Sequence, residues 1–376
     1  MADININEQL SLLALSRVQG VRVSLLRRLL DTVGSATELF ANLDDIYNIV
    51  PGVSPQLVEA LSDVSIIERA KREMDFICAK GIKLISIGSD DYPCRLSECD
   101  DAPIVLYSLG NANLNAPHIV SVVGTRHATD YGKELCKHFI TDLARMLPDT
   151  LIVSGLAYGI DVCAHKAALE TGLPTVGVLA HGLDRIYPQT HRNIAKEMLA
   201  NGGLLTEFMS ETNSLPAYFV QRNRIVAGIA DATVVVESAS SGGSLITASL
   251  AQSYARDCFA FPGRVSDQYS CGCNELISRN KAALITSAYD LVEAMNWTIS
   301  KPRKKKVEPE LFPELSEQES RLIQLLRSNS DGMQINQIVV ALNIPINNIM
   351  SLLFELEMKG LVKAVAGGLY RVPFQF

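Results

Sequence analysis

The stretches Ile119-Val-Ser-Val-Val-Gly-Thr-Arg126 and Leu151-Ile-Val-Ser-Gly-Leu-Ala-Tyr-Gly-Ile-Asp161 decide the fold of this chain. In each, a short apolar and β-branched run stops at a glycine and gives way to a stretch of helical character, which is the pattern of a strand followed by a helix. The loop of such a unit exposes backbone N–H groups at a helix N-terminus, where anions bind well. Residues 116–161 therefore predict two neighbouring anion-binding turns.

The same alternation of strand and helix continues on both sides of these turns. Short apolar runs separated mostly by helical stretches predict strands at residues 82–87, 104–107, 119–123, 151–154, 175–179, 204–207, 232–237, 258–261 and 283–286. This pattern is typical of a Rossmann-like α/β fold with a doubly wound, mostly parallel sheet. Ligands of such sheets bind at the carboxyl ends of the strands, where the glycine loops fall.

Four segments are predicted along the chain. Residues 1–65 read as a helical domain with a weak repeat around Gly20 and Gly52, typical of a SAM or helix-hairpin-helix module or of a plain helical bundle. Residues 66–299 form the Rossmann-like domain. Residues 300–314 hold a run of cations and three prolines and read as a linker. Residues 315–376 form a winged helix.

The prediction of a winged helix rests on three helices followed by a hairpin. Ser316 and Glu319 have the spacing of a capping box, helices are expected at 335–342 and 345–359, and an alternating pattern surrounds Gly367-Gly368. The third helix carries two acids and one base, whereas a helix lying along phosphates should be cationic. We therefore favour a protein-contact or regulatory role for this domain over strong DNA binding.

Composition narrows the class of protein. The 376 residues are 48% hydrophobic and 20% charged, as in a globular protein with a core, and the formal net charge of −7 argues against coating nucleic acid over the whole surface. No apolar run is long enough for a membrane span, and the first residues lack a secretory signal, so we expect a cytoplasmic protein. The eight cysteines lack zinc-site spacing, so no metal is expected.

Arginines provide the candidate anion ligands. Arg126 follows the first glycine turn. Arg222 and Arg224 stand on either side of Asn223, just before an apolar run that is expected to be helical. The N-terminus of a helix disfavours cations, so their position suggests that an anion binds there. The alternative for the last two is a structural ion pair with Glu207 or Glu237.

Other loops add polar and aromatic groups. Gly242, Gly243 and Ser244 open a third strand-to-helix turn that could cradle an anion. Arg185 lies in a fourth loop, and aromatic side chains at 131, 158, 187 and 219 could stack on bases beside the cations. The loops match neither G-x-G-x-x-G nor a Walker loop, so no nucleotide cofactor is expected.

No catalytic constellation is evident. The six histidines lack metal-site spacing, and Ser154-Gly155 is not a nucleophile elbow. Asp161 and Glu237 follow glycine loops and are the candidate acid or base groups, although Asp161 is more simply a favourable charge at a helix start.

The motifs together resemble those of the DprA/Smf family of bacterial DNA-processing proteins. Residues 82–286 carry the resemblance through Val123-Gly-Thr-Arg126, Ser154-Gly-Leu-Ala-Tyr-Gly-Ile-Asp161, Gly182-Leu-Asp-Arg-Ile-Tyr-Pro188, Arg222-Asn-Arg-Ile-Val-Ala-Gly228, Ser241-Gly-Gly-Ser-Leu-Ile-Thr-Ala248 and Phe261-Pro-Gly263. The resemblance implies a homodimer, formed through the Rossmann-like domain, that binds and protects single-stranded DNA during natural transformation and loads the RecA recombinase.

By the same resemblance, Arg126, Arg222 and Arg224 line the DNA pocket together with Ser154 and the loop 241–244. Tyr158 stands where some members have a basic residue, so stacking replaces a charge pair there.

Two functions follow as hypotheses. The first is a non-enzymatic recombination mediator that binds single-stranded DNA through converging arginines. The alternative is a Rossmann-like hydrolase of nucleotide N-glycosidic bonds that uses Glu237 or Asp161 as its acid.

Overall fold

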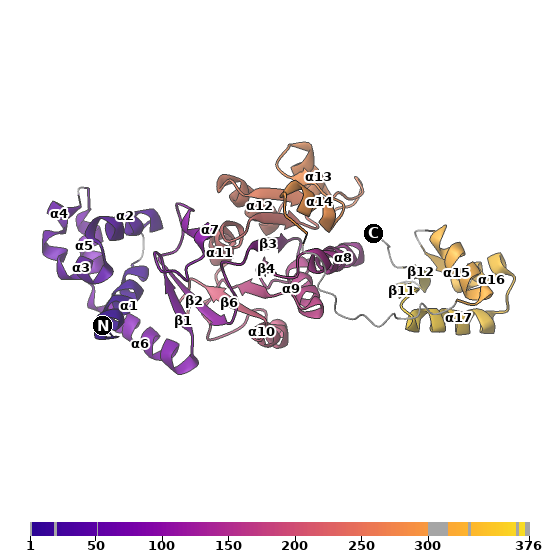
Figure 1. Ribbon diagram of the computed structural model, residues 1–376, viewed down its shortest axis with the longest axis horizontal. Helices are drawn as coiled ribbons and strands as arrows, with labels where there is room; N and C mark the ends of the chain where they lie inside the picture. The colour runs from indigo at the N-terminus through magenta and orange to yellow at the C-terminus, as the bar shows by residue number, and fades with distance from the viewer. Residues whose placement is uncertain are drawn as a thin grey trace. The chain divides into compact units, whose positions relative to one another are not determined.

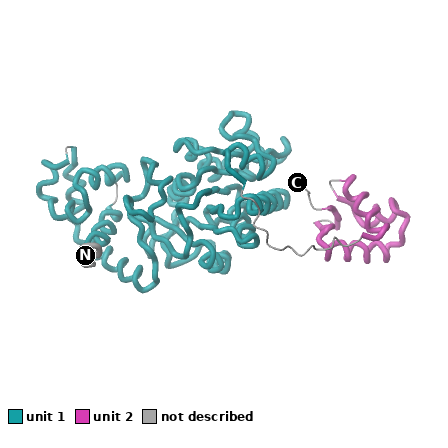
Figure 2. The backbone as a smooth tube through the Cα atoms, viewed as in Figure 1, with its two compact units in different colours: residues 1–302 teal, residues 303–376 magenta. Residues whose placement is uncertain are grey.

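The computed structural model describes residues 2–18, 21–50, 52–299, 315–329, 332–365 and 368–372. The chain forms two compact units, residues 1–302 and residues 303–376 (Figure 2). The predicted linker at 300–314 lies outside the described residues, as does Gly20 of the predicted helical repeat.

Helices make up the beginning of the first unit. They are α1 (Ala2–Ser16), α2 (Val23–Val33), α3 (Ala36–Ala41), the 3₁₀ helix η1 (Leu43–Asp45), α4 (Ile46–Ile49), α5 (Pro55–Leu61) and α6 (Val64–Lys80). Side-chain caps at Ser35 and Ser54 begin α3 and α5, and Gly81 ends α6 in the left-handed conformation (φ 62°), as predicted. Their apolar side chains pack against Val105 and Tyr107 of the sheet. The predicted boundary near residue 65 stays a prediction.

A nine-stranded sheet forms the centre of the first unit (Figure 1). Its strands are β1 (Lys83–Ser86), β2 (Val105–Gly110), β3 (His118–Val123), β4 (Thr150–Ser154), β5 (Thr175–Val178), β6 (Gly202–Thr206), β7 (Ala232–Val235), β8 (Asp257–Ala260) and β9 (Ala283–Leu284). The order is β1-β2-β6-β5-β4-β3-β7-β8-β9, antiparallel at β1-β2 and β2-β6 and parallel elsewhere. The predicted Rossmann-like, mostly parallel sheet is confirmed.

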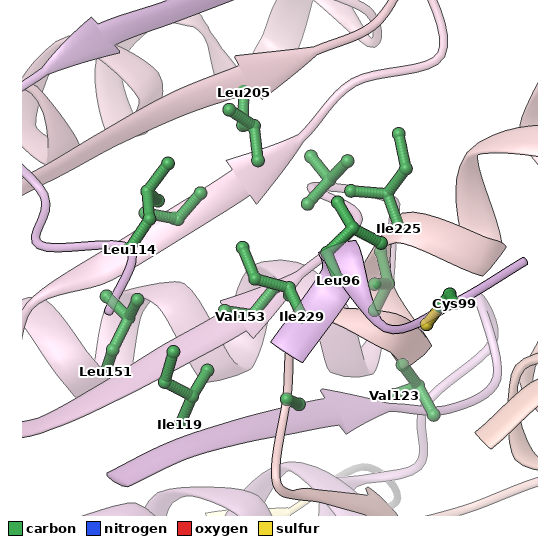
Figure 3. Close-up of a cluster of buried hydrophobic side chains, with 14 of the residues drawn as sticks. Leu96, Cys99, Leu114, Ile119, Val123, Leu151, Val153, Leu205, Ile225 and Ile229 are labelled. Carbon is green, nitrogen blue, oxygen red and sulfur yellow. The ribbon is translucent and has the colours of Figure 1, made fainter. Parts of the chain in front are cut away.

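Helices cover both faces of the sheet because its strands are apolar on both sides. They are α7 (Cys94–Ser97), α8 (Asp130–Met146), α9 (Ile160–Thr171), η2 (Gln189–His191), α10 (Arg192–Met198), α11 (Pro216–Gly228), α12 (Gly243–Ser253), α13 (Cys271–Ser278) and α14 (Ala288–Ala294). Strand β3 shows the alternation: Ile119 and Val123 join the core under α11 and α12, and Val120 and Val122 join the core under α8 and α9. Figure 3 shows the first of these cores, where Leu96 and Ile225 meet the sheet.

The chain reverses its direction of winding at β3. From β3 it proceeds through β4, β5 and β6 on one side, and then returns to add β7, β8 and β9 on the other side. The loops after β3 and β7 therefore diverge from adjacent strands, which opens a crevice at their carboxyl ends. The first glycine turn predicted from the sequence lies at this switch point.

The second unit contains three helices and a small sheet, as predicted for a winged helix. Its elements are α15 (Glu317–Arg327), β10 (Met333–Gln334), α16 (Ile335–Leu342), α17 (Ile346–Met358), β11 (Lys363–Val365) and β12 (Leu369–Arg371). The capping box of Ser316 and Glu319 is present, and Leu322, Ile338 and Leu353 belong to a separate core.

The outer face of α17 is apolar. Ile346, Met350, Phe354 and Met358 recur every fourth residue and expose 45%, 54%, 65% and 75% of their surface. This face carries no cation, so it differs from a helix that lies along a phosphate backbone.

Within the described residues, no single helix has both the length and the apolar composition to cross a membrane, and the bent pair α16 and α17, at 111°, passes only by length and composition.

Candidate nucleic-acid interface

A large open cavity lies at the switch point of the sheet. Its volume is about 1410 Å³, and its walls come from the loops after β3, β4 and β7, the start of α12 and one side of α11. The three loops are far apart in sequence and meet because β4, β3 and β7 are parallel neighbours, and α11 reaches them from its place on one face of the sheet.

Glycines let the cavity loops approach one another. A Cβ at Gly124 would lie 2.5 Å from the side chain of Ile160, and a Cβ at Gly155 would lie 2.6 Å from the guanidinium carbon of Arg222. Gly159 has φ 79° and faces the backbone of Thr125 and Arg126, so a side chain there would be strained as well as obstructed. The glycines of both turns are therefore required for close packing around the cavity.

The N-terminus of α12 opens into the cavity. Its N-cap is Gly242, at φ 153°, and Gly242, Gly243 and Ser244 all line the wall. The hydroxyls of Ser244 and Ser238 are 2.8 Å apart and hydrogen-bond to each other. Because the first N–H groups of a helix lack intrahelical acceptors and carry partial positive charge, this end favours an anion.

Two arginines and one phenylalanine form the cationic side of the cavity. The guanidinium carbons of Arg126 and Arg222 lie 5.5 Å and 6.0 Å from the ring centre of Phe219. Arg126 is exposed, and among the described residues it makes no ion pair. Two cations held on one ring leave a positive potential that a phosphate would neutralise.

Arg222 is buried and fixed in place. Its Nη1 donates to the carbonyl oxygen of Gly155 at 2.6 Å and to that of Val178, and its Nε donates to Asn223 Oδ1 at 3.2 Å. Burial lowers the pKa of its guanidinium to about 10, while nearby Asp161 raises it and Arg126 lowers it. The side chain stays charged at neutral pH, and its position does not depend on a ligand.

Asp161 supports Arg222 from the start of α9. Its Oδ2 accepts hydrogen bonds from the N–H groups of Gly155 at 3.1 Å and Ala157 at 3.4 Å, which fixes the second glycine turn. Burial raises the pKa of this carboxyl, and Arg222 opposes the shift. The simpler interpretation of Asp161, a favourable charge at a helix start, fits this geometry.

A second hollow of about 430 Å³ shares Arg126 and His127 with the cavity wall. Lys133 and Tyr158 also line it, and Tyr158 is 47% exposed. The Tyr158 ring meets that of His191 edge to face, with centres 5.0 Å apart. The Lys133 ammonium pairs with Asp130 at 3.2 Å at an exposed position, so the second hollow adds an ion-paired lysine and an exposed ring beside the first cavity.

Arg224 does not belong to the cavity, so the prediction that the three arginines converge is wrong for this residue. It is buried, pairs with Glu207 and donates to the carbonyl oxygen of Asp101. Helix α11 begins at Pro216, so Arg222 and Arg224 lie within the helix and not before it. Residues two apart on a helix point in nearly opposite directions. The structural ion pair considered as the alternative is what the structure contains.

Ser154 and Arg185, two further predicted binding residues, also lie away from the cavity wall. The Ser154 hydroxyl is buried and donates to the carbonyl oxygen of Val122 at 2.6 Å. Arg185 is exposed, lines neither hollow, and pairs with its neighbour Asp184 at 3.0 Å.

Glu237 is likewise absent from the cavity wall. Its carboxylate accepts from the Thr129 N–H at 2.9 Å and from the Thr129 hydroxyl at 2.5 Å. Burial raises the pKa of this carboxyl, and the hydrogen bonds from Thr129 lower it. Its role is to hold the loop before α8, and the proposed use of Glu237 as a hydrolytic acid is not supported by its position.

Some residues that line the cavities were not predicted from the sequence. The rings of His127 and Tyr269 stack with centres 6.2 Å apart at the cavity wall, and Lys133 lines the second hollow. Lys133 could have been found, because it stands in the first turn of the helix after the glycine turn. Tyr269 lies in a loop between β8 and α13 without a recognisable pattern.

Comparison with known proteins gives the relatives of this chain. Relatives from Mycobacterium tuberculosis are 38% identical over 240 residues, and the match covers 60% of this chain and 61% of their length. The X-ray structure of DNA processing protein A from Streptococcus pneumoniae superposes with a TM-score of 0.57 at 30% identity, covering 72% of this chain and 97% of that one.

A structure describing the single-stranded DNA binding mode of DNA processing protein A from Helicobacter pylori has a TM-score of 0.52 at 28% identity, covering 57% of this chain and 95% of that one. The family model of the DprA winged helix domain matches residues 307–368. The model described as DNA recombination-mediator protein A matches residues 83–296, more than half of the sequence. The resemblance drawn from the motifs is confirmed, and the chain belongs to the DNA recombination-mediator protein A family.

Proposed function

We propose that the cavity at the switch point binds the sugar-phosphate backbone of single-stranded DNA. The observation that carries this proposal is the pair of guanidiniums on Phe219, which line the same cavity as the N-terminus of α12. One of the two arginines, Arg126, is exposed and makes no ion pair among the described residues. Cations placed beside an aromatic ring suit a strand whose bases are unpaired.

The dimensions of the site favour a chain over a small ligand. At about 1410 Å³ the cavity exceeds the range of roughly 300–1,000 Å³ typical of small-molecule sites. The second hollow shares two residues with it and adds Tyr158 and Lys133, the latter paired with Asp130, so polar and aromatic surface continues past the first anion site. A polymer with a repeated phosphate uses such a continued surface.

The relative from Helicobacter pylori supports this choice of ligand, because its structure concerns single-stranded DNA binding. From the family we further propose that the protein works in the cytoplasm as a homodimer, protects incoming DNA in natural transformation and loads RecA. Order-of-addition experiments with RecA and DNA coated by a single-strand binding protein test the last step. Faster RecA assembly in the presence of this protein is expected, and an unchanged rate would contradict it.

We propose a non-enzymatic role. Of the two candidate acids, Asp161 lines the cavity, but its Oδ2 accepts from two backbone N–H groups and nearby Arg222 favours its charged form. Incubation with nucleoside monophosphates should release no free base. Release of base that is lost in Asp161→Asn would favour the hydrolase instead.

The binding proposal is tested by anisotropy of a labelled oligothymidylate at several salt concentrations. For single strands the slope of log affinity against log salt is about −0.7 per neutralised phosphate, so Arg126→Ala should make the slope shallower by roughly 0.7 and weaken binding. Arg185→Ala is the matched control, because Arg185 is an exposed arginine outside both hollows. Equal losses in the two variants would show a diffuse charge effect and refute the assignment.

A further inference from the structure

Two cysteines meet where α8 packs on α9. Figure 1 shows these helices side by side, and small residues of α9 at the contact, Ala164 and Ala168, let them approach closely. The Cys163 thiol of α9 donates to the Lys133 carbonyl oxygen of α8, with Sγ and O 3.6 Å apart. Cys136 stands three residues after Lys133, on the same face of α8, and is within hydrogen-bonding reach of Cys163.

The two thiols differ in access and in charge environment. Cys136 is buried, and Cys163 is partly exposed. The hydrogen bond from Cys136 lowers the pKa of Cys163, with help from the ammonium groups of Lys133 and Lys166, whereas burial and Glu170 oppose the shift. The same hydrogen bond and burial raise the pKa of Cys136. This is the arrangement of an attacking thiolate that solvent can reach beside a protected second thiol.

A second pair of neighbouring cysteines lacks these features. Cys258 and Cys273 are both buried, and burial raises the pKa of each to about 12. Glu237 raises the pKa of Cys273 further. The chain therefore supplies its own comparison between a partly exposed pair near cations and a buried pair near an acid.

We propose that Cys163 is an oxidation site for hydrogen peroxide and that Cys136 resolves the product into a disulfide joining α8 to α9. The Cys163 thiolate attacks one peroxide oxygen, the O–O bond breaks, and the departing hydroxide takes a proton to give water and a sulfenic acid. The Cys136 sulfur then attacks the sulfenic sulfur, the S–O bond breaks, and the hydroxide leaves as water with the Cys136 proton. Two thiols are oxidised and one peroxide is reduced.

The experiment treats the reduced full-length protein with one to two equivalents of hydrogen peroxide. Peptide mapping by mass spectrometry without reductant should show the peptides holding residues 136 and 163 joined, with a loss of two hydrogens that dithiothreitol reverses. Cys258 and Cys273 should remain free. This experiment on the wild-type protein shows whether the disulfide between Cys136 and Cys163 forms, so its result does not depend on whether a variant folds.

Two variants separate the steps. In Cys136→Ala the Cys163 sulfenic acid should persist and be trapped by dimedone, and in Cys163→Ala no cross-link should form at Cys136. The proposal is overturned if Cys163 stays reduced while the exposed Cys78 and Cys94 are oxidised, or if the cross-link joins Cys258 to Cys273.

Discussion

Replacing Gly155 by alanine tests how the second glycine turn sets the position of Arg222. The new Cβ would lie 2.6 Å from the guanidinium carbon and from Nη2 of Arg222. The guanidinium cannot give way freely, because it is buried and donates to the carbonyl oxygens of Gly155 and Val178. Either the turn or the arginine must move.

The expected loss of stability and of affinity follows from the contacts that Arg222 would lose. Forcing an extra carbon into a packed site costs about 1–3 kcal/mol, and each hydrogen bond to a charged group that is lost costs about 1.5–3 kcal/mol. A domain of this size loses roughly 2–4 °C in melting temperature per kcal/mol. Gly155→Ala should therefore lower the melting temperature by several degrees and weaken binding of oligothymidylate, since Arg222 leaves its place on Phe219.

The assay pairs thermal unfolding with fluorescence anisotropy, and Gly177→Ala serves as the control. Gly177 lies on the neighbouring strand β5, and its nearest contact for a Cβ is the flexible Met198 Cε at 3.1 Å, so little change is expected. If Gly155→Ala binds oligothymidylate and unfolds like the wild type, the second glycine turn does not hold Arg222 in place.

Three further predictions concern stability and the second unit. Arg224→Ala should lower the free energy of unfolding by roughly 3–5 kcal/mol in chemical denaturation, because Glu207 is left buried without its partner. The control Arg145→Ala breaks an exposed ion pair and should cost less than about 1 kcal/mol. Similar losses in the two variants would contradict a stabilising buried pair. Burial lowers the pKa of His165 to about 3 from 6.5. Between these two pKa values the unfolded chain binds more protons than the folded one, so the free energy of unfolding is at its full value above pH 6.5 and falls below it by up to about 1.4 kcal/mol per pH unit. His165→Gln should make the denaturation midpoints less dependent on pH across this range. An unchanged pH dependence would show that His165 is not the group responsible. Phe354→Ala, on the apolar face of α17, should leave the anisotropy titration with oligothymidylate unchanged, and a loss of affinity would show that this helix contacts DNA.

The fold could be predicted from the sequence because the spacing of apolar residues and the local choice of residue types decide where helices and strands form. All nine predicted strands are present within two or three residues at either end, and the capping box at Ser316 and the glycine cap at Gly81 are where the pattern placed them. The antiparallel pairing of β1 with β2 and of β2 with β6 could not be read in this way, since pairing depends on where distant strands meet.

The candidate site was predicted in part. Arg126 and the start of α12 line the cavity because they follow the ends of the adjacent strands β3 and β7, and Arg222 reaches the same cavity from α11. Arg224 was wrongly assigned to the cavity because helix α11 was expected to begin after it, whereas the helix begins at Pro216. Within a helix, two residues that are two positions apart point to opposite sides, so only one of Arg222 and Arg224 can face the cavity. Tyr269 reaches the wall from a loop whose course depends on tertiary packing alone.

The most direct test of the central claim is a photo-crosslink from an oligonucleotide carrying 5-iododeoxyuridine, mapped by mass spectrometry on the full-length protein. Adducts are expected at the aromatic residues of the cavity and the second hollow, above all Phe219 and Tyr158. Adducts confined to residues 315–372, with none in the first unit, would contradict this expectation.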